Sequence, residues 1–341
     1  MMKSLFYGAA VAIALTLTAC GVSTNDRTEA EPDVKPNAHY PVTMQNYTKP
    51  EGANAWKEKD QVFKQAPERI MVNTRPAAEI LLHLGLGDKI VGVGASFGIP
   101  DKEVEEEYEK LNILSEEYVG KEVTLGTDPD FVYGRGGLFE SAEWGVGTVD
   151  SLNDLGIKTY ALESSIPGGT YESLYQDIEN LGTIFNVQDK ASKFMNKLKE
   201  KQAKITSKLE SIDEKKTFVY LHMSNPDEVN VYPAGDETFF NDAFNMINME
   251  NIYKGETGEV SIETLIEDDP DIFILPILNS NKAAVEDIKD ALYANPKLSS
   301  MKAIKNRQIY SVDYNYLFGY SYNTIDGMEM LAKEVYPDLF N

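Results

Sequence analysis

Residues 69–93 read RIMVNTRPAAEILLHLGLGDKIVGV, and this stretch decides the fold. The apolar run at 69–72 predicts a short strand. From Pro76 to Leu86 the apolar residues recur at helical spacing, and glycines end the helix. The apolar run at 90–93 predicts a second strand. A strand, a helix and a strand joined by turns this short indicate parallel strands with a helix on one face of the sheet.

The same alternation continues along the chain. Further strands are predicted at 131–133, 158–162, 217–221, 229–232, 272–275 and 308–311, and further helices around 101–111 and at 146–155, 239–248, 261–268, 282–294 and 325–335. The middle differs, because a helix at 171–185 precedes one long amphipathic helix at 188–212. We therefore predict an α/β fold of two Rossmann-like lobes with mainly parallel sheets, joined by one long backbone helix. A coiled-coil segment is the alternative reading of 188–212.

The sequence divides into five predicted parts. They are a lipoprotein signal peptide at 1–19, a disordered tether at 20–39, an N-terminal lobe at 40–166, connecting helices at 167–213 and a C-terminal lobe at 214–341. The tether is rich in Ser, Thr, Asp, Glu and Pro and cannot bury a core, and it takes His39 with it. The lobe after it opens with a strand-like stretch at 40–44, and residues 47–60 are polar and predicted to be a loop.

The N-terminus carries an export signal. Lys3 precedes an apolar run from about Leu5 to Leu17, which is shorter than the roughly 20 residues of a membrane span. The run ends in Leu-Thr-Ala-Cys-Gly at 17–21, a pattern that resembles the lipobox of bacterial lipoproteins. Cys20 is the only cysteine in the chain, so it has no disulfide partner. We expect Cys20 to be lipidated (palmitate or another acyl chain) and to hold the protein on the extracytoplasmic face of the cell membrane. An ordinary signal peptide that happens to contain a cysteine is the alternative.

The net charge of −23 limits the partners. A chain this acidic repels nucleic acid and anionic lipid head groups, so we expect no nucleic-acid partner and an anchor made of acyl chains. No second apolar segment of spanning length follows the signal, and the chain is expected to be a monomer.

Candidate ligand-binding residues follow from the rule that ligands collect at the carboxyl ends of parallel strands. The strongest local signal is the aromatic segment 314–320, which we place in a loop and interpret as an aromatic wall for a large planar or metal-chelate ligand. Arg135 lies among glycines and could bind carboxylate or hydroxamate oxygen, although a surface salt bridge remains open. The candidates are Arg75, Phe97, Tyr133, Arg135, Trp144, His222, Tyr232, Tyr314, Tyr316 and Tyr320.

Two other chemistries are weighed and set lower. Three histidines and one cysteine without ligand spacing argue against a transition-metal site built by the protein, and no permanent cofactor is expected. Residues 94–98, Gly-Ala-Ser-Phe-Gly, match the Gly-x-Ser-x-Gly elbow of serine hydrolases, with His222 as a later partner. The elbow requires a helix directly after Ser96, and Ile99-Pro100-Asp101 intervenes. A lipid-anchored serine hydrolase is therefore a remote alternative.

Several blocks in the right order resemble one family. They are 40–43 (Tyr-Pro-Val-Thr), 66–70 (Ala-Pro-Glu-Arg-Ile), 78–81 (Ala-Glu-Ile-Leu), 84–93 (Leu-Gly-Leu-Gly-Asp-Lys-Ile-Val-Gly-Val), the Asp-Pro-Asp starts at 128–130 and 269–271, and 302–310 (Lys-Ala-Ile-Lys-Asn-Arg-Gln-Ile-Tyr). With these blocks, residues 40–340 resemble the substrate-binding lipoproteins of ABC importers for iron–siderophore complexes, haem and cobalamin. The resemblance implies two Rossmann-like lobes with a long backbone helix and a binding protein, not an enzyme.

The resemblance also implies partners. One exposed glutamate per lobe contacts the permease dimer in such proteins, and Glu122 and Glu263 are similar to the two by their position ahead of the Pro-Asp strands. The implied ligand is an iron–siderophore complex that carries its own metal, with cobalamin or haem as alternatives. The stretch 276–279, Pro-Ile-Leu-Asn, has no histidine, which weakens haem, and the scattered basic residues weaken a catecholate. The loop 133–137, Tyr-Gly-Arg-Gly-Gly, is also similar to a loop of cobalamin binders.

Overall fold

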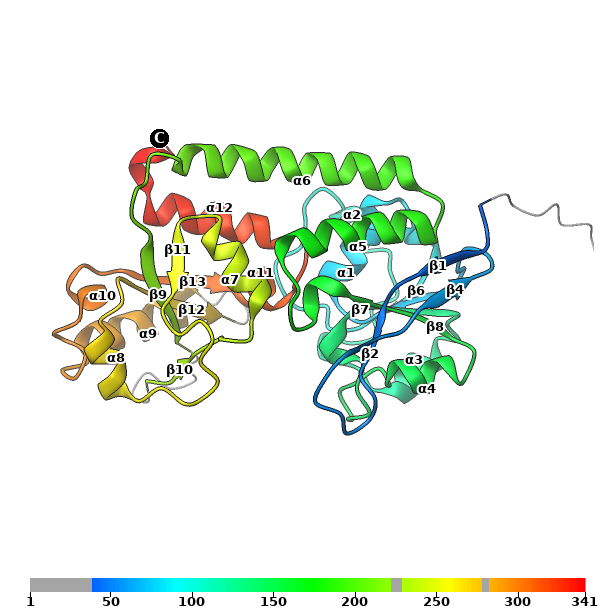
Figure 1. Cartoon of the computed structure of the whole chain (residues 1–341), viewed down its shortest axis with the longest axis horizontal. Helices are drawn as coiled ribbons and strands as arrows, with labels where there is room; N and C mark the ends of the chain where they lie inside the picture. The colour runs from blue at the N-terminus through cyan, green and yellow to red at the C-terminus, as the bar shows by residue number, and fades with distance from the viewer. Residues whose placement is uncertain (1–38, 222–228, 278–281, 341) are drawn as a thin grey trace, which may run out of the picture. The chain divides into compact units, whose positions relative to one another are not determined.

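The computed structural model describes residues 39–221, 229–277 and 282–340, and residues 38–341 form one compact unit. Two mainly parallel sheets follow one another along the chain, and helices pack on their faces (Figure 1). This arrangement confirms the predicted α/β fold with parallel sheets. The boundaries assigned to the five parts of the sequence stay a prediction.

The first sheet has the strand order β6-β5-β7-β8, and every pair in it is parallel. Its strands are β5 (Ile70–Val72), β6 (Ile90–Val93), β7 (Phe131–Arg135) and β8 (Lys158–Leu162). All three residues of β5 are buried, because helices cover both faces of a parallel sheet. The continuous apolar run at 69–72 is the sequence signature of such a strand.

The second sheet repeats this order. Its strands are β9 (Lys216–Leu221), β10 (Val231–Tyr232), β11 (Met249–Asn251), β12 (Ile272–Ile277) and β13 (Ile309–Asp313). The parallel strands run β11-β9-β12-β13, which is the order of β6-β5-β7-β8. The short strand β10 pairs antiparallel with the end of β9, beyond the residues that pair with β11, and the first sheet has no such strand. The two halves of the chain therefore share one topology.

The Asp-Pro-Asp motifs start the equivalent strands β7 and β12. Asp130 accepts hydrogen bonds from the backbone N–H groups of Glu68 and Arg69, both at 2.9 Å, at the start of β5. Asp271 accepts a bond of 3.0 Å from the backbone N–H of Thr217 in β9. Each motif thus fixes the third strand of its sheet to the first strand.

Helices connect and cover the strands. They are α1 (Arg75–His83), α2 (Glu105–Tyr108), α3 (Lys121–Gly126), α4 (Val149–Asn153), α5 (Tyr171–Ile184), α6 (Gln188–Leu209), α7 (Thr238–Asn245), α8 (Ile262–Asp268), α9 (Lys282–Ala294), α10 (Lys302–Lys305), α11 (Tyr314–Phe318) and α12 (Thr324–Val335). Single turns of 3-10 helix lie at Gly87–Lys89, Gly136–Leu138, Glu163–Ser165 and Pro337–Leu339. None of the helices that the structure describes is long and apolar enough to cross a membrane.

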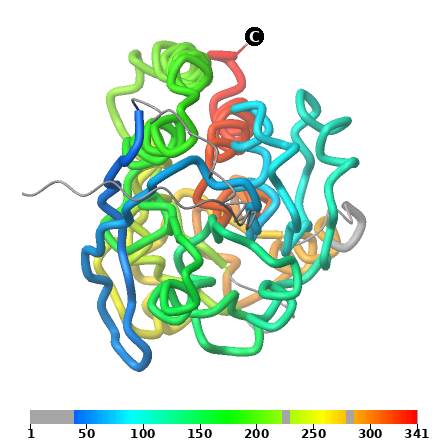
Figure 2. Tube along the Cα trace, turned by 90° about the vertical axis from the view of Figure 1, so that its right-hand side faces the viewer, coloured from blue at the N-terminus to red at the C-terminus, as the bar shows by residue number. Residues whose placement is uncertain are grey.

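The long helix α6 confirms the prediction for the middle of the chain. Its buried residues are those of the predicted stripe: Ala191, Phe194, Leu198, Ile205 and Leu209. With 22 residues it is about 33 Å long. It packs against α5 and α12, and Figure 2 shows the three helices nearly end-on and side by side. The stripe is therefore buried within this chain, and a coiled-coil partner is not needed to cover it.

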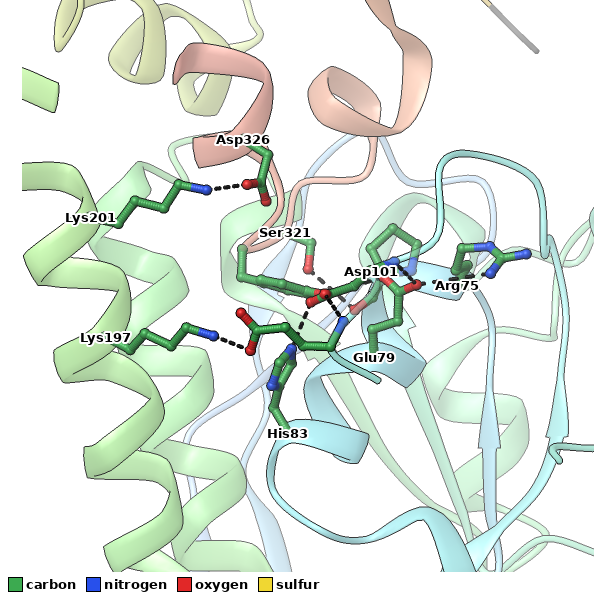
Figure 3. A network of polar contacts seen from close by, with 11 residues as sticks. Arg75, Glu79, His83, Asp101, Lys197, Lys201, Ser321 and Asp326 are labelled. Carbon is green, nitrogen blue, oxygen red and sulfur yellow. Dashed lines mark hydrogen bonds and ion pairs between the residues drawn. The ribbon is translucent and has the colours of Figure 1, made fainter. Parts of the chain in front are cut away.

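Lysines on α6 form ion pairs with residues from both halves of the chain. Lys197 pairs with Glu103, which follows β6, and Lys201, one turn further on, pairs with Asp326 of α12 (Figure 3). Lys201 also lies 3.5 Å from Glu329 of the same helix. Helix α6 thus braces both halves of the chain.

Some local predictions were wrong. The predicted loop at 47–60 contains β2 (Tyr47–Thr48) and β3 (Lys57–Glu58), which pair with each other, and β1 (Val42–Met44) pairs with β4 (Gln61–Phe63). The helix expected around 101–111 is only the single turn α2. His39 was assigned to the tether, but its ring nitrogen Nε2 lies 2.7 Å from the carbonyl of Thr183. Tertiary pairing, which polar composition does not reveal, orders these segments.

Candidate ligand site

Arg135 ends β7 and lies among aromatic side chains from both halves of the chain. Its Nη1 donates to the hydroxyl of Tyr118 at 3.3 Å, and its guanidinium carbon lies 4.9 Å from the centre of the Tyr320 ring. The phenyl ring of Phe97 contacts Tyr118 at 5.7 Å and Tyr314 at 6.3 Å between ring centres. One cation therefore lies in a partly exposed aromatic cluster, with the charge from the first half and the rings from both halves.

The rings of the second half form a connected wall. Tyr314 stacks on Phe318 at 4.5 Å, and Phe318 contacts Tyr232 at 6.1 Å and Phe240 at 4.7 Å. Tyr314 and Phe318 are one turn apart on α11, so both rings lie on one side of that helix. The segment that we placed in a loop is therefore a short helix, and its spacing puts Tyr314 and Phe318 together on one side.

The backbone of Arg135 is held by Asn73, at the carboxyl end of the neighbouring strand β5. The N–H of Arg135 donates to Asn73 Oδ1 at 2.8 Å, and Asn73 Nδ2 donates to the carbonyl of Arg135 at 3.0 Å. Gly134 makes this clamp possible: its φ is +138°, and a Cβ at this position would lie 2.0 Å from Asn73 Oδ1. The Tyr-Gly-Arg-Gly-Gly sequence thus allows a side chain to reach and fix the arginine backbone.

The surroundings of Arg135 favour its charged form. Burial by itself lowers the pKa of the guanidinium, but the neighbouring hydroxyls of Tyr320, Tyr118 and Tyr314 raise it above its usual value. No ion pair of Arg135 with a carboxylate occurs among the described residues. The guanidinium therefore keeps hydrogen-bonding capacity for an oxygen-rich ligand.

Glu237 organises the wall from behind. It precedes α7, and each of its carboxylate oxygens accepts one tyrosine hydroxyl at 2.7 Å, from Tyr232 to Oε1 and from Tyr320 to Oε2. Burial, followed by the repulsion of Glu237, raises the pKa of both tyrosines. The two phenols therefore stay protonated and act as donors to this carboxylate.

The segment after β13 also contacts the first half of the chain directly. The hydroxyl of Ser164 donates to the carbonyl of Tyr320 at 2.8 Å, and Asn315 Nδ2 donates to the carbonyl of Phe97. A side chain of one half thus bonds to a backbone carbonyl of the other half twice, once from α11 and once just after it, which fixes the aromatic wall relative to Arg135.

The structure gives Arg75 a different role from the predicted one. Its Nε donates to the carbonyl of Ser96 at 2.7 Å, and its guanidinium lies 4.1 Å from the ring centre of Tyr108. Its Nη1 lies 3.9 Å from Oε1 of the buried Glu79, one turn later on α1 (Figure 3). Arg75 therefore braces the loop after β6, and these internal contacts argue against a ligand contact.

Other predicted ligand residues also lie elsewhere. Tyr133 is wholly buried between Phe131 and Tyr160 in the first core, so its ring faces no ligand. Trp144 is 47% exposed and follows Glu143, whose carbonyl touches Gly120 at the start of α3. Tyr133 and Arg135 lie two residues apart and on the same face of β7, but Tyr133 lies within the sheet core while Arg135 ends the strand, which the sequence order did not reveal.

Tyr316 lines a separate cavity of about 390 Å³, between α9, β13 and α12, together with Ile99 and Met330. On α11 it points to a different side from Tyr314 and Phe318. Of the predicted set, Phe97, Arg135, Tyr232, Tyr314 and Tyr320 are brought together. His222 and Cys20 lie outside the described residues.

Ser96 does not form a nucleophile elbow. Ala95 has φ +46°, and no helix begins between Ser96 and Glu105. Among the described residues, no three His, Cys, Asp or Glu side chains are grouped to hold a metal ion. The nucleophile elbow weighed for residues 94–98 is therefore not formed at Ser96.

The two glutamates assigned to the permease occupy equivalent positions. Glu122 is the second residue of α3, which precedes β7, and Glu263 is the second residue of α8, which precedes β12. Both are exposed. Because β7 and β12 are the third strands of two sheets with the same order, the glutamates are related by the repeat of the fold.

Sequence reasoning missed Tyr118 and Glu237. Tyr118 lies in an irregular acidic stretch and Glu237 in a turn before α7, so neither follows a predicted strand. Aromatic and acidic residues are common in irregular stretches and turns, and no sequence signal distinguishes Tyr118 and Glu237 from the other residues of that kind. Only the folded chain places them beside Arg135 and its tyrosines.

The comparisons with known proteins show the family of this chain. A model of the periplasmic binding protein family matches residues 70–316, so this chain belongs to that family. The ABC transporter substrate-binding lipoprotein YvrC of Bacillus subtilis, itself uncharacterized, is 26% identical over 339 residues, 98% of this chain and 97% of its own length. The chain is thus a periplasmic binding protein and not an enzyme, so the hydrolase alternative is wrong.

Solved structures share the fold. A periplasmic binding protein from Veillonella parvula superposes with a TM-score of 0.75 at 22% identity, over 87% of this chain and 99% of that one. An ABC-type Fe3+-hydroxamate transport system protein from Saccharomonospora viridis has a TM-score of 0.69 at 23% identity, over 87% and 100%. The architecture of two sheets and a long helix is therefore that of periplasmic binding proteins.

Proposed function

We propose that this protein captures a ferric siderophore outside the cell membrane and delivers it to the permease of an ABC importer. The observation that carries the proposal is the position of Arg135, a cation held by Asn73 within an aromatic cluster from both halves of the chain. A guanidinium matches the paired oxygens of a carboxylate or hydroxamate, and aromatic rings cover the apolar faces of a chelate. The solved relative from an Fe3+-hydroxamate transport system supports the same ligand class.

The charge of the site supports a particular kind of chelate. Arg135 is a single cation, whereas Glu237 lies behind the tyrosines and Glu163 precedes Ser164 nearby. One guanidinium balances about one exposed anionic group, so a hydroxamate or citrate-type chelate suits the site better than a highly charged catecholate. The ligand brings its own chelated iron in this proposal, and the protein contributes no metal ligand. Cobalamin or haem, bound by the same mechanism, is the alternative.

The delivery step rests on Glu122 and Glu263. Two exposed carboxylates at equivalent helix positions offer one contact from each half of the chain to basic pockets on a permease dimer. The lipid-anchored state rests on Cys20 and the sequence before it. We propose that the mature monomer is held by acyl chains on the extracytoplasmic face, where the tether lets it reach the permease.

The proposal is tested by titrating the purified protein with ferric citrate, a neutral ferric hydroxamate, a ferric catecholate, haemin and cyanocobalamin, following tyrosine and tryptophan fluorescence. We expect saturable quenching by the citrate or hydroxamate chelate. Saturation by cyanocobalamin or haemin alone would select the alternative. Absence of saturation with all five ligands would refute capture of a metal chelate.

A further inference from the structure

We propose that Glu237 is a positioning residue of the ligand site. It fixes the ring of Tyr320, and through this ring it determines how strongly Arg135 binds an anionic oxygen of the ligand. Glu237 itself does not touch Arg135 in this arrangement. The inference deepens the proposed function and rests on it for the identity of the ligand, but the link from Glu237 to Arg135 is a property of the protein alone.

The first step of the argument is the hydrogen-bond pattern at Glu237. Tyr232 comes from β10 and Tyr320 from the turn after α11, and each donates its single hydroxyl proton to a different carboxylate oxygen at 2.7 Å. No ion pair of Glu237 with a lysine or arginine occurs in the described part of the chain. Both oxygens are thus satisfied by phenols, and the carboxylate holds two tyrosines that are distant in sequence.

The second step is that Tyr320 is held in a costly conformation. Its φ is +46°, a region that a residue with a Cβ rarely adopts and that costs on the order of 1 kcal/mol or more. Four contacts keep it there: the bond to Glu237, the Ser164 hydroxyl on its carbonyl at 2.8 Å, and stacking on Phe240 at 4.9 Å beside Phe239 at 6.0 Å. These contacts together fix the position of the Tyr320 ring.

The third step connects the ring to the cation. The guanidinium of Arg135 lies over the face of Tyr320, 4.9 Å from its centre. A phenol that donates its proton to a carboxylate has a more electron-rich ring, which strengthens its attraction for a cation above it. If Glu237 is lost, the face of the Tyr320 ring attracts the guanidinium less strongly, and the ring is free to rotate. Arg135 then loses one of the contacts that hold its side chain.

Glu237→Ala tests this step, because the loss of positioning and the loss of a negative charge change the affinity for an anionic chelate in opposite directions. Removing a nearby negative charge, taken alone, strengthens the binding of an anionic chelate. Loss of positioning weakens it, by about fivefold to thirtyfold if the support is worth 1–2 kcal/mol. The affinity for ferric citrate is compared in wild type, Glu237→Ala, Glu237→Gln and Tyr320→Phe. Glu237→Gln retains one acceptor and should lie between wild type and Glu237→Ala.

A readout without ligand separates this inference from the proposed function. The Nε–H signal of Arg135 is followed by NMR in the full chain with isotope-labelled arginine and is assigned by its loss in Arg135→Lys. We expect its exchange with solvent to become about fivefold to thirtyfold faster in Glu237→Ala and in Tyr320→Phe, with no further increase in the double variant. The exposed Glu250→Gln, on β11, is the matched control and should leave the signal unchanged.

The outcomes are distinct. If Arg135 loosens in Glu237→Ala but the wild type binds no chelate, the positioning role stands and the proposed ligand class fails. If the Arg135 signal is unchanged in Glu237→Ala while the protein remains folded by circular dichroism, or if ferric citrate binds more tightly to that variant, the positioning role is overturned.

Discussion

The hydroxyl of Tyr322 donates to Asp101 Oδ2 at 2.7 Å and lies 3.2 Å from Glu79 Oε2, so one proton serves two carboxyl groups. His83 Nε2 lies 2.8 Å from the same Asp101 oxygen (Figure 3). The His83 ring stacks on Phe194 of α6, with 4.2 Å between the ring centres. The network joins α1, the loop after β6, α6 and the segment before α12. Charge changes in it therefore affect the contact between the two halves of the chain.

Glu79 should make stability depend on pH. Burial raises its pKa from the usual 4.5 to about 7, and the Asp101 carboxylate adds to this, while the Asp101 N–H, Arg75 and Tyr322 oppose it. Because the folded state holds the proton more tightly, the free energy of unfolding falls as pH rises from about 4.5 to 7, by about 3 kcal/mol, and then levels. We expect Glu79→Gln to reduce this fall, measured by urea unfolding at a series of pH values.

Asp177 contributes separately to the same pH range. Its pKa is raised by burial to about 7, although it accepts hydrogen bonds from the backbone of Ser164 and Glu163. Part of the pH dependence should therefore remain in Glu79→Gln and be reduced further by Asp177→Asn as well. An unfolding free energy with the same pH profile in wild type and Glu79→Gln would contradict the prediction.

Arg135→Ala and Arg135→Lys should separate charge from geometry at the ligand site. A lysine keeps the charge but not the planar fork of donors, so we expect the affinity for an anionic ferric chelate to fall roughly tenfold with lysine and further with alanine. Affinity is measured by fluorescence quenching. Arg75→Lys is the matched comparison: since Arg75 braces the loop after β6, it should lower the melting temperature more than the affinity.

Gly134→Ala should disturb the same site through the backbone. The added methyl group would lie 2.0 Å from Asn73 Oδ1, at a φ of +138° that alanine rarely adopts. We expect a loss of about 2 kcal/mol or more in the free energy of unfolding together with weaker chelate binding. Gly168→Ala, at φ +93° with no atom within 4 Å, is the control for backbone strain alone. Equal losses in the two variants would show that the Asn73 clamp is unimportant.

Glu122→Ala combined with Glu263→Ala should leave chelate binding intact and abolish uptake. Both side chains are exposed at the start of short helices, away from buried contacts, so folding should be unaffected. Uptake by cells is followed with a radiolabelled form of the chelate that binds in vitro. Glu116→Ala with Glu267→Ala, two other exposed glutamates, is the matched control. Normal uptake in the first double variant would remove the docking assignment.

Cys20→Ala should release the protein from the membrane without weakening chelate binding. A single attached acyl chain gives only marginal membrane affinity, and two chains give a lasting anchor. Because Cys20→Ala removes the site of lipid attachment, we expect complete release from the membrane. Fractionation of cells and labelling with a fatty-acid analogue measure the effect. Retention of the variant in the membrane fraction would favour another mode of attachment.

The sequence by itself predicted the elements that depend on local pattern. The buried run at 69–72, the helix after Pro76 and the apolar stripe of 188–212 have periods that only one secondary structure satisfies, and the Pro-Asp starts mark the equivalent strands β7 and β12. It also singled out Arg135, Phe97, Tyr232, Tyr314 and Tyr320, which the structure brings together, because strand ends and glycine-rich turns are visible in a linear sequence. Their contact with a ligand stays a prediction.

The tertiary structure alone decided which side chains meet. Tyr133 precedes Arg135 by two residues, yet its ring is buried while the arginine lies at the end of the strand, where the chain leaves the sheet. Tyr118 and Glu237 have no sequence signal and reach the cluster through irregular segments. Arg75 is bound by Ser96 and Tyr108, which a spacing rule cannot foresee. Local pattern fixes the period of an element, but contacts between distant residues depend on how the elements pack. That packing places Arg135 in the aromatic cluster and binds Arg75 to the loop after β6.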